Sequence, residues 1–150
     1  MRFDEIAVGQ DAELSKTITD EDVMSFARVT GDFNPVHVDE IAAARSRFGG
    51  RIAHGMLSAG LISAAIAGKL PGPSSIYLSQ TLRFTLPVRI GDTITVYLRV
   101  IELIEGKRRV KLSTVCKNQK GETVVEGEAL VLVPDEPVEA VPSVASVSTA

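Results

Sequence analysis

Residues 52–69, which read IAHGMLSAGLISAAIAGK, are the most informative segment for the fold. Its uncharged part, Ile52 to Gly68, is 17 residues long. Apolar residues fall on every side of a helix drawn through this stretch, a pattern typical of a helix enclosed by the rest of the protein. The run is short for a bilayer span and contains His54 and two serines, so we expect no membrane association. The prolines and glycine of 71–73 end the helix.

The chain after this helix is predicted to be all strand. Apolar residues alternate along four runs, and Gly-containing turns of favourable composition separate them. These runs cover 76–86, 94–100, 110–116 and 123–133. A long buried helix followed by a four-strand antiparallel meander predicts an α+β protein of the hot-dog type, in which the sheet wraps around the helix.

The segments before the helix are also readable. Residues 11–18 alternate as a short strand. Thr19 and Asp22 have the spacing of a capping box, and Gly31 is placed to end the helix that follows. We expect Asp32 to His37 to be an irregular, extended loop, because the residue before a proline is pushed out of the helical region. A short helix is expected near 39–47.

Length and composition set the broad class. With 150 residues, 45% apolar and 23% charged, the chain fits one globular domain, which we place at 1–134, with a flexible tail over 135–150. The net charge of −3 and the lack of a basic cluster argue against nucleic-acid binding. The single cysteine, Cys116, excludes an internal disulfide. The N-terminus lacks signal-peptide features, so we expect a cytoplasmic protein.

The candidate site is the segment Gly31-Asp32-Phe33-Asn34-Pro35-Val36-His37. Asp, Asn and Pro are common in turns, so a purely structural turn is one interpretation. The alternative is an acid–base site, because a carboxylate and an imidazole five residues apart on a loop stiffened by Pro35 can converge on one ligand. Spacing alone does not name a reaction.

The same region resembles a known family. Residues 26–37, FARVTGDFNPVH, together with Ala43, are similar to the signature of the MaoC-like (R)-specific enoyl-CoA hydratases. The similarity continues through HGML at 54–57 and SIYLSQTLRF at 75–84, and it spans most of residues 8–133. The resemblance implies a hot-dog homodimer that hydrates trans-2-enoyl-CoA to (R)-3-hydroxyacyl-CoA, in fatty acid metabolism or polyhydroxyalkanoate precursor supply. No cofactor is expected, since coenzyme A is part of the substrate, and with two histidines and one cysteine we expect no zinc site.

The resemblance also implies roles for individual residues. Asp32 and His37 would be the catalytic pair, Gly55 would offer its backbone N–H to the thioester oxygen, and Ser63 would stand beside the catalytic loop. Asn34 is expected to shape the loop or to contact substrate. Gly55 opens the buried helix, where free N–H groups and the helix dipole favour negative charge, although a glycine required by packing is the alternative.

Other points stay open at this level. We interpret His54 as structural. The phosphates of coenzyme A could meet any of several basic residues, for which surface charge is the plain alternative: Arg45, Arg47, Arg51, Lys69, Arg83 and Arg89. The competing functions are a 3-hydroxyacyl-[acyl-carrier-protein] dehydratase, a hot-dog acyl-CoA thioesterase and a non-catalytic acyl-CoA-binding subunit.

Overall fold

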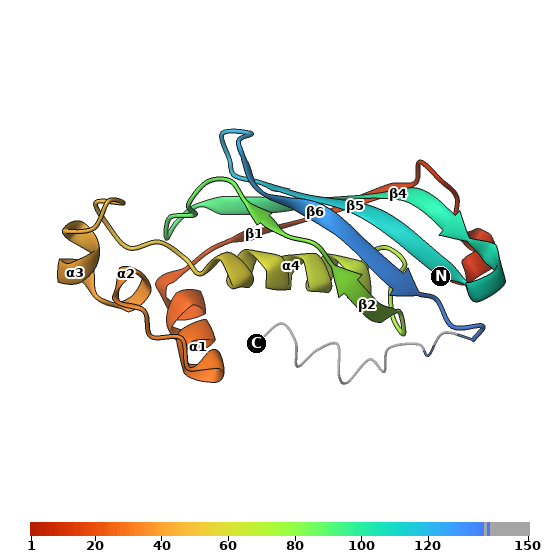
Figure 1. Cartoon of the computed structure of the whole chain (residues 1–150), viewed down its shortest axis with the longest axis horizontal. Helices are drawn as coiled ribbons and strands as arrows, with labels where there is room; N and C mark the ends of the chain where they lie inside the picture. The colour runs from red at the N-terminus through yellow and green to blue at the C-terminus, as the bar shows by residue number, and fades with distance from the viewer. Residues whose placement is uncertain (137, 139–150) are drawn as a thin grey trace.

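The computed structural model describes residues 1–136 and 138, and it shows one sheet laid against one long helix (Figure 1). Most of the predicted tail therefore lies outside the described residues. The helices are η1 (Phe3–Glu5), α1 (Asp20–Thr30), α2 (Pro35–Val38), α3 (Glu40–Ala44), α4 (Gly55–Gly68) and η2 (Glu105–Lys107). The strands are β1 (Asp11–Thr17), β2 (Ile76–Gln80), β3 (Arg83–Phe84), β4 (Thr93–Ile104), β5 (Arg109–Lys117) and β6 (Thr123–Leu132).

The sheet is antiparallel throughout, with the order β1-β4-β5-β6-β2, and β3 also pairs with β6. The predicted meander is correct for β4, β5 and β6 and wrong for the remaining strand. The expected strand 76–86 is divided into β2 and β3, and it joins the far edge of β6 while β1 takes the free edge of β4. Alternation specifies which face of a strand is buried, but it does not specify the neighbour.

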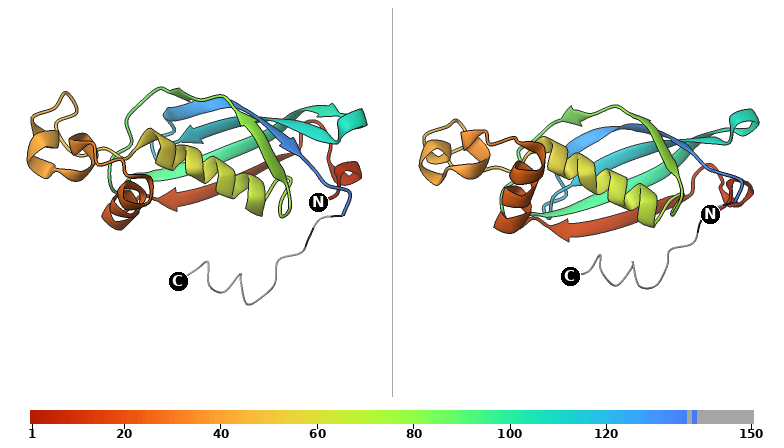
Figure 2. Two further views of the ribbon diagram at one scale, coloured as in Figure 1. Left: turned by 60° about the horizontal axis from the view of Figure 1, so that its bottom comes forward. Right: turned by 90° about the horizontal axis from the view of Figure 1, so that it is seen from below.

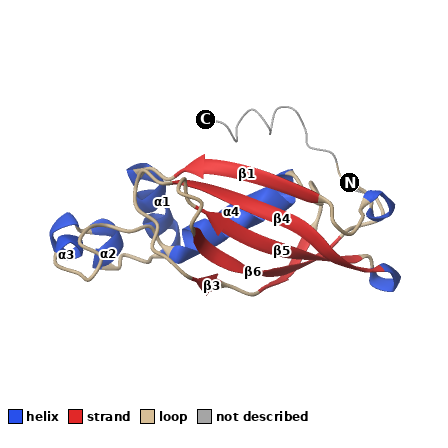
Figure 3. Cartoon of the chain, turned by 90° about the horizontal axis from the view of Figure 1, so that it is seen from above, coloured by secondary structure: helices blue, strands red, loops and turns tan. Residues whose placement is uncertain are grey.

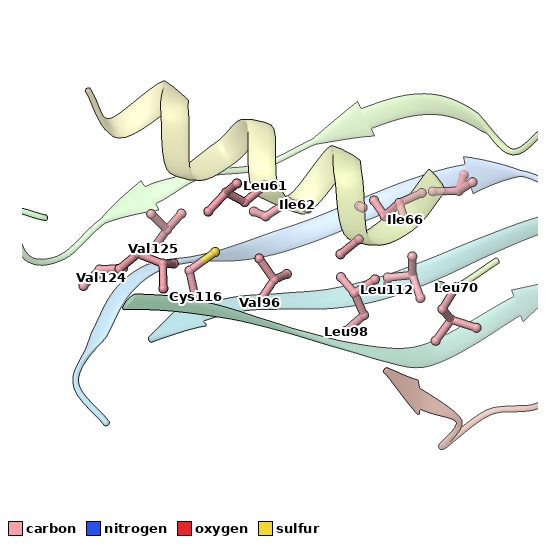
Figure 4. Close-up of a cluster of buried hydrophobic side chains, with 14 of the residues drawn as sticks. Leu61, Ile62, Ile66, Leu70, Val96, Leu98, Leu112, Cys116, Val124 and Val125 are labelled. Carbon is pink, nitrogen blue, oxygen red and sulfur yellow. The ribbon is translucent and has the colours of Figure 1, made fainter. Parts of the chain in front are cut away.

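The core lies between the sheet and α4, as Figure 4 shows. Leu61, Ile62 and Ile66 of α4 point at the inward side chains of the sheet. Every second residue of β5 is buried, in agreement with the predicted alternation. Cys116 is one of these residues, and burial raises the pKa of its thiol to about 12, which fits a structural thiol.

The helix α4 begins at Gly55, later than the predicted Ile52, and its enclosure is incomplete. Its buried residues face the sheet, whereas Met56, Gly60 and Ser63 are exposed. Figure 2 shows α4 from below with no helix or strand in front of it. The expectation of a fully enclosed helix is therefore wrong for the single chain, because one sheet can cover only one side of a helix. Among the described residues, no helix is both long enough and apolar enough to cross a membrane.

The helices α1, α2 and α3 gather at one end of the sheet, near the start of α4 (Figure 3). The capping box of α1 is formed: the Asp22 N–H donates to Thr19 Oγ1 and the Thr19 N–H donates to the Asp22 carboxylate. Gly31 ends α1 with φ of +80°, a left-handed conformation that favours glycine. Both predictions are confirmed.

Candidate active site

His37 lies on α2, a one-turn helix where an extended loop was expected. Asn34 is its N-cap and Pro35 its first residue, a position where proline lacks no needed donor and its fixed φ suits the helix. The proline effect on the preceding residue is still present, because Asn34 itself is non-helical. The short helix turns the imidazole inward, so that its side chain is 8% exposed.

The hydrogen bonding of His37 fixes its protonation pattern. Its Nδ1 lies 2.8 Å from the carbonyl oxygen of Ile52. A carbonyl oxygen only accepts, so Nδ1 carries the proton and donates it. In the neutral ring, Nε2 then has a free lone pair. His37 can therefore accept a proton from a water molecule at Nε2.

The pKa of His37 lies below its usual value of 6.5. Burial is the main cause, because it disfavours the charged ring, and the neighbouring His54 lowers the pKa further. The bond to Ile52 and the charge of Asp32 act in the opposite direction without reversing the shift. His37 is therefore neutral near pH 7, the form that can serve as a base.

Asp32 lies on the short connection between α1 and α2. Its backbone N–H donates to Thr30 Oγ1 (3.2 Å), and its Oδ1 accepts the N–H of Asn34 (3.2 Å). Asn34 in turn accepts the Val36 N–H at its side-chain oxygen (3.4 Å), so its visible role is to shape the loop. Asp32 and His37 each place an ionisable atom within 4.8 Å of the other. The structure thus brings the two predicted catalytic side chains together.

Both side chains line a cavity of about 470 Å³. Gly55 and Ser58 of α4 line it as well, and most of the remaining wall is apolar: Phe84, Leu86, Val88, Val124 and Val125. Gly55 is the first residue of α4, where backbone N–H groups have no partner within the helix. A cavity with an apolar wall and a few convergent polar groups is typical of a small-molecule site.

The glycine at position 55 also has a packing reason. A Cβ atom there would lie 2.6 Å from the ring of Phe84, which is closer than atoms can approach. The oxyanion and packing interpretations of Gly55 are therefore compatible, because Phe84, the side chain that a Cβ atom would meet, also lines the cavity. Gly55 could not be replaced without moving the wall of the cavity.

A metal ion does not fit the donor set as it is arranged. Asp32, His37 and His54 place one possible ligand atom each within 4.8 Å of one another. However, the two imidazole rings are stacked, with centroids 3.9 Å apart and planes at 27°. Nitrogen lone pairs lie in the ring plane, so those of stacked rings run side by side and do not converge on one ion.

Known proteins resemble this chain over most of its length. The profile of the MaoC-like domain matches residues 4–124. The chain is 51% identical to a 3-hydroxybutyryl-CoA dehydratase of Methylorubrum extorquens (88% of this chain, 83% of the relative). It is 49% identical to an (R)-specific enoyl-CoA hydratase of Rhodospirillum rubrum (88% and 91%). The structure superposes on the unliganded R-hydratase PhaJ1 of Pseudomonas aeruginosa with a TM-score of 0.86, at 50% identity over 94% of this chain and 93% of that one.

This chain belongs to the MaoC-like family.

The single MaoC-like chain does not bring one residue implied by the family resemblance, Ser63, to the cavity. Ser63 has an exposed side chain and does not line the cavity. Eight residues of helix advance about 12 Å, which carries Ser63 two turns beyond Gly55. Within the single chain, Ser63 is therefore not beside the catalytic loop. Ser58, on the first turn of α4, lines the cavity instead, and it is completely buried.

Arg51 is part of the framework of the MaoC-like site. Its Nε donates to the carbonyl oxygen of His37 (2.6 Å), and its guanidinium forms ion pairs with Asp20 of α1 and Glu40 of α3. The side chain is 9% exposed, so this arginine is not free to meet a phosphate. Its position joins α1, α2 and α3 behind His37, and no feature of the local sequence distinguished it from the other basic residues.

Proposed function

We propose that this MaoC-like protein is an (R)-specific enoyl-CoA hydratase, which adds water to trans-2-enoyl-CoA to give (R)-3-hydroxyacyl-CoA and catalyses the reverse dehydration. The observation that carries the proposal is the pairing of Asp32 with a buried, neutral His37 at one cavity. The names of the relatives in Rhodospirillum and Pseudomonas support the same reaction. No cofactor is required, because coenzyme A belongs to the substrate.

The reaction follows from the protonation pattern. A water molecule held between His37 Nε2 and the Asp32 carboxylate loses a proton to this pair, and its oxygen forms a bond with C3. The double bond shifts its electrons through C2 to the thioester oxygen, and the pair returns a proton to C2. One water therefore supplies both added atoms. Because both additions come from the side on which the pair lies, the addition is syn.

The thioester oxygen carries negative charge in the enolate-like transition state. The backbone N–H of Gly55, at the positive end of α4, is the proposed donor to this oxygen. Removal of one such donor in other enzymes costs about 3–4 kcal/mol of transition-state stabilisation. A donor on the backbone has the advantage of a fixed position.

The first test is the loss of enoyl absorbance with crotonyl-CoA and longer enoyl-CoAs, with the configuration of the product determined. We expect Asp32→Asn and His37→Ala each to lower kcat by about 10²-fold or more, since each removes a general acid–base group. Circular dichroism should show that both variants are folded. Unchanged activity in either variant would exclude the mechanism. Release of free thiol together with the unhydrated 2-enoic acid would instead identify a thioesterase.

The carrier of the acyl group requires its own test. Arg47 lines the cavity wall and forms no ion pair among the residues that the structure describes. We assign it to a phosphate of coenzyme A. Arg47→Gln should raise KM for enoyl-CoA several-fold and leave KM for the N-acetylcysteamine thioester unchanged. A higher kcat/KM on the enoyl thioester of acyl carrier protein than on enoyl-CoA would favour the carrier-protein dehydratase.

A homodimer is part of the proposal. The edge strand β2 and the segment after it expose large apolar side chains, which is unusual for a free surface: Ile76, Tyr77, Leu78, Phe84 and Leu86. β2 pairs with β6 on one side, and an uncovered strand edge can pair with another chain. A second copy would cover this edge and the free face of α4. We retain the cytoplasm as the proposed location and acyl-CoA as the only ligand class.

A further inference from the structure

His54 is the buried group that the proposed reaction does not use. It is the N-cap of α4, directly before Gly55, and its side chain is 2% exposed. Its Nε2 lies 2.9 Å from the backbone carbonyl oxygen of Asp32. Its ring stacks on the ring of His37, with centroids 3.9 Å apart, and lies beside the ring of Phe26, with centroids 4.8 Å apart. One side chain therefore touches both members of the catalytic pair.

The hydrogen bonds determine the tautomer of His54. The carbonyl oxygen of Asp32 only accepts, so Nε2 of His54 carries the proton. The neutral ring then has an acceptor at Nδ1, and this atom is buried without a partner. The hydroxyl oxygen of Ser58 is likewise buried without a partner.

We propose that His54 is a positioning residue for the catalytic pair: its Nε2–H holds the backbone carbonyl oxygen of Asp32 while its ring stacks on His37. This inference rests on the proposed hydratase function.

The connection between α1 and α2, which carries Asp32, needs a hydrogen bond of this kind to hold its position. Its carboxylate is exposed, and the loop hydrogen bonds to Thr30 and Asn34 are local ones. The bond from His54 is the one that joins the Asp32 backbone to α4, the element that also carries Gly55. It therefore fixes the acid–base pair relative to the oxyanion donor. A displacement of about 1 Å between such groups can reduce a rate about 10²-fold.

The stacking adds an electrostatic contribution. Asp32, His37 and His54 are the ionisable groups that meet here, and Phe26 is the neighbour from α1. The ring centroids of His54 and His37 are 3.9 Å apart, so positive charge on both rings is disfavoured and the pKa of His37 is lowered.

The experiment compares two replacements of His54. In His54→Gln, the side-chain amide keeps a donor near the position of Nε2. In His54→Phe, the ring remains and the donor is lost. We expect kcat of His54→Phe to fall about 10- to 100-fold with KM changed less than threefold, and His54→Gln to recover most of kcat.

The acid limb of the kcat/KM profile provides a readout that general loss of packing would not move. His54 lowers the pKa of His37, so both His54 variants should shift this limb to higher pH. Val96→Ala is the matched control: it removes volume from the fully buried core away from the cavity, so it should lower the melting temperature and leave kcat and the acid limb unchanged.

The outcomes separate the inference from the proposed function. A wild-type protein without hydratase activity would overturn the function, and the inference with it. An active wild type with an equally active His54→Phe variant would overturn only the inference. The same holds if His54→Gln is as impaired as His54→Phe, because the donor would then be irrelevant.

Discussion

Each of the two buried histidines donates one ring N–H to a backbone carbonyl, which leaves one free nitrogen per ring. In His37 the free nitrogen is Nε2, and in His54 it is Nδ1. The division of proton-transfer roles at this site depends on these two bonds. The sequence, which shows only that a histidine follows an aspartate by five residues, leaves that division open.

The pH dependence follows from the lowered pKa of His37. The hydration reaction needs neutral His37, and the neutral form persists below pH 6.5 because its pKa lies under this value. We therefore expect the acid limb of kcat/KM to have its midpoint below 6.5. The measurement is a rate profile from pH 4.5 to 8, supported by NMR titration of the imidazole. An acid midpoint above 7 would contradict a neutral buried base.

The same shift predicts a change in stability. Between the folded and unfolded pKa values the unfolded chain binds more protons, so the free energy of unfolding rises with pH. His37 therefore contributes stability above pH 6.5, and this contribution is lost as the pH falls from 6.5 through the lower pKa of the folded state. Urea unfolding of the wild type and of His37→Gln across this range should show a smaller pH slope for the variant. Equal slopes would contradict the assignment.

At the scale of the elements, Arg51 is the residue that joins three helices to one another. Arg51→Met should lower the free energy of unfolding by about 1–3 kcal/mol, since it removes charge-assisted hydrogen bonds of a mostly buried side chain. Arg28→Met is the matched control. Its ion pair with Glu21 is exposed on both sides and should contribute about 0–1 kcal/mol. Urea denaturation measures both, and similar losses would argue against a special role for Arg51.

The start of α4 supports a second prediction at this scale. Gly55→Ala places a methyl group against the half-exposed ring of Phe84, which can shift, so we expect a loss of only about 1 kcal/mol of stability and a strong loss of kcat. Phe84→Ala in the same chain removes the overlap. The double variant should recover stability relative to Gly55→Ala and remain slow, because the methyl group still occupies the approach to the backbone N–H. Full recovery of kcat would show that Gly55 serves packing alone.

At the scale of the whole molecule, the exposed apolar edge predicts self-association. Light scattering after gel filtration should give twice the chain mass of 16.0 kDa. A charged side chain on the edge strand β2, as in Ile76→Glu, should shift the protein toward the monomer and reduce hydratase activity. Val8→Glu, which places the same charge on an exposed residue outside this edge, is the control. A monomeric wild type with full activity would contradict the proposed dimer.

The features that depend on near neighbours in the chain could be predicted from the amino-acid sequence. The caps of α1 at Thr19 and Gly31, the long helix and the alternation along β4 to β6 were all predicted, because hydrogen bonds at a helix end and side-chain periodicity are local properties. The Gly31–His37 segment was also readable, because its carboxylate, proline and imidazole lie within a few residues of one another.

The features that join distant parts of the chain depend on tertiary packing and could not be predicted in this way. These are the place of β2 beside β6, the free face of α4, the burial of Ser58, and the contact of His54 with Asp32 across twenty-two residues. Strand order and cavity lining depend on which surfaces pack together, and many arrangements satisfy the same periodicity. The position of His54 is thus set by how α4 docks against the α1–α2 connection, and no local pattern records it.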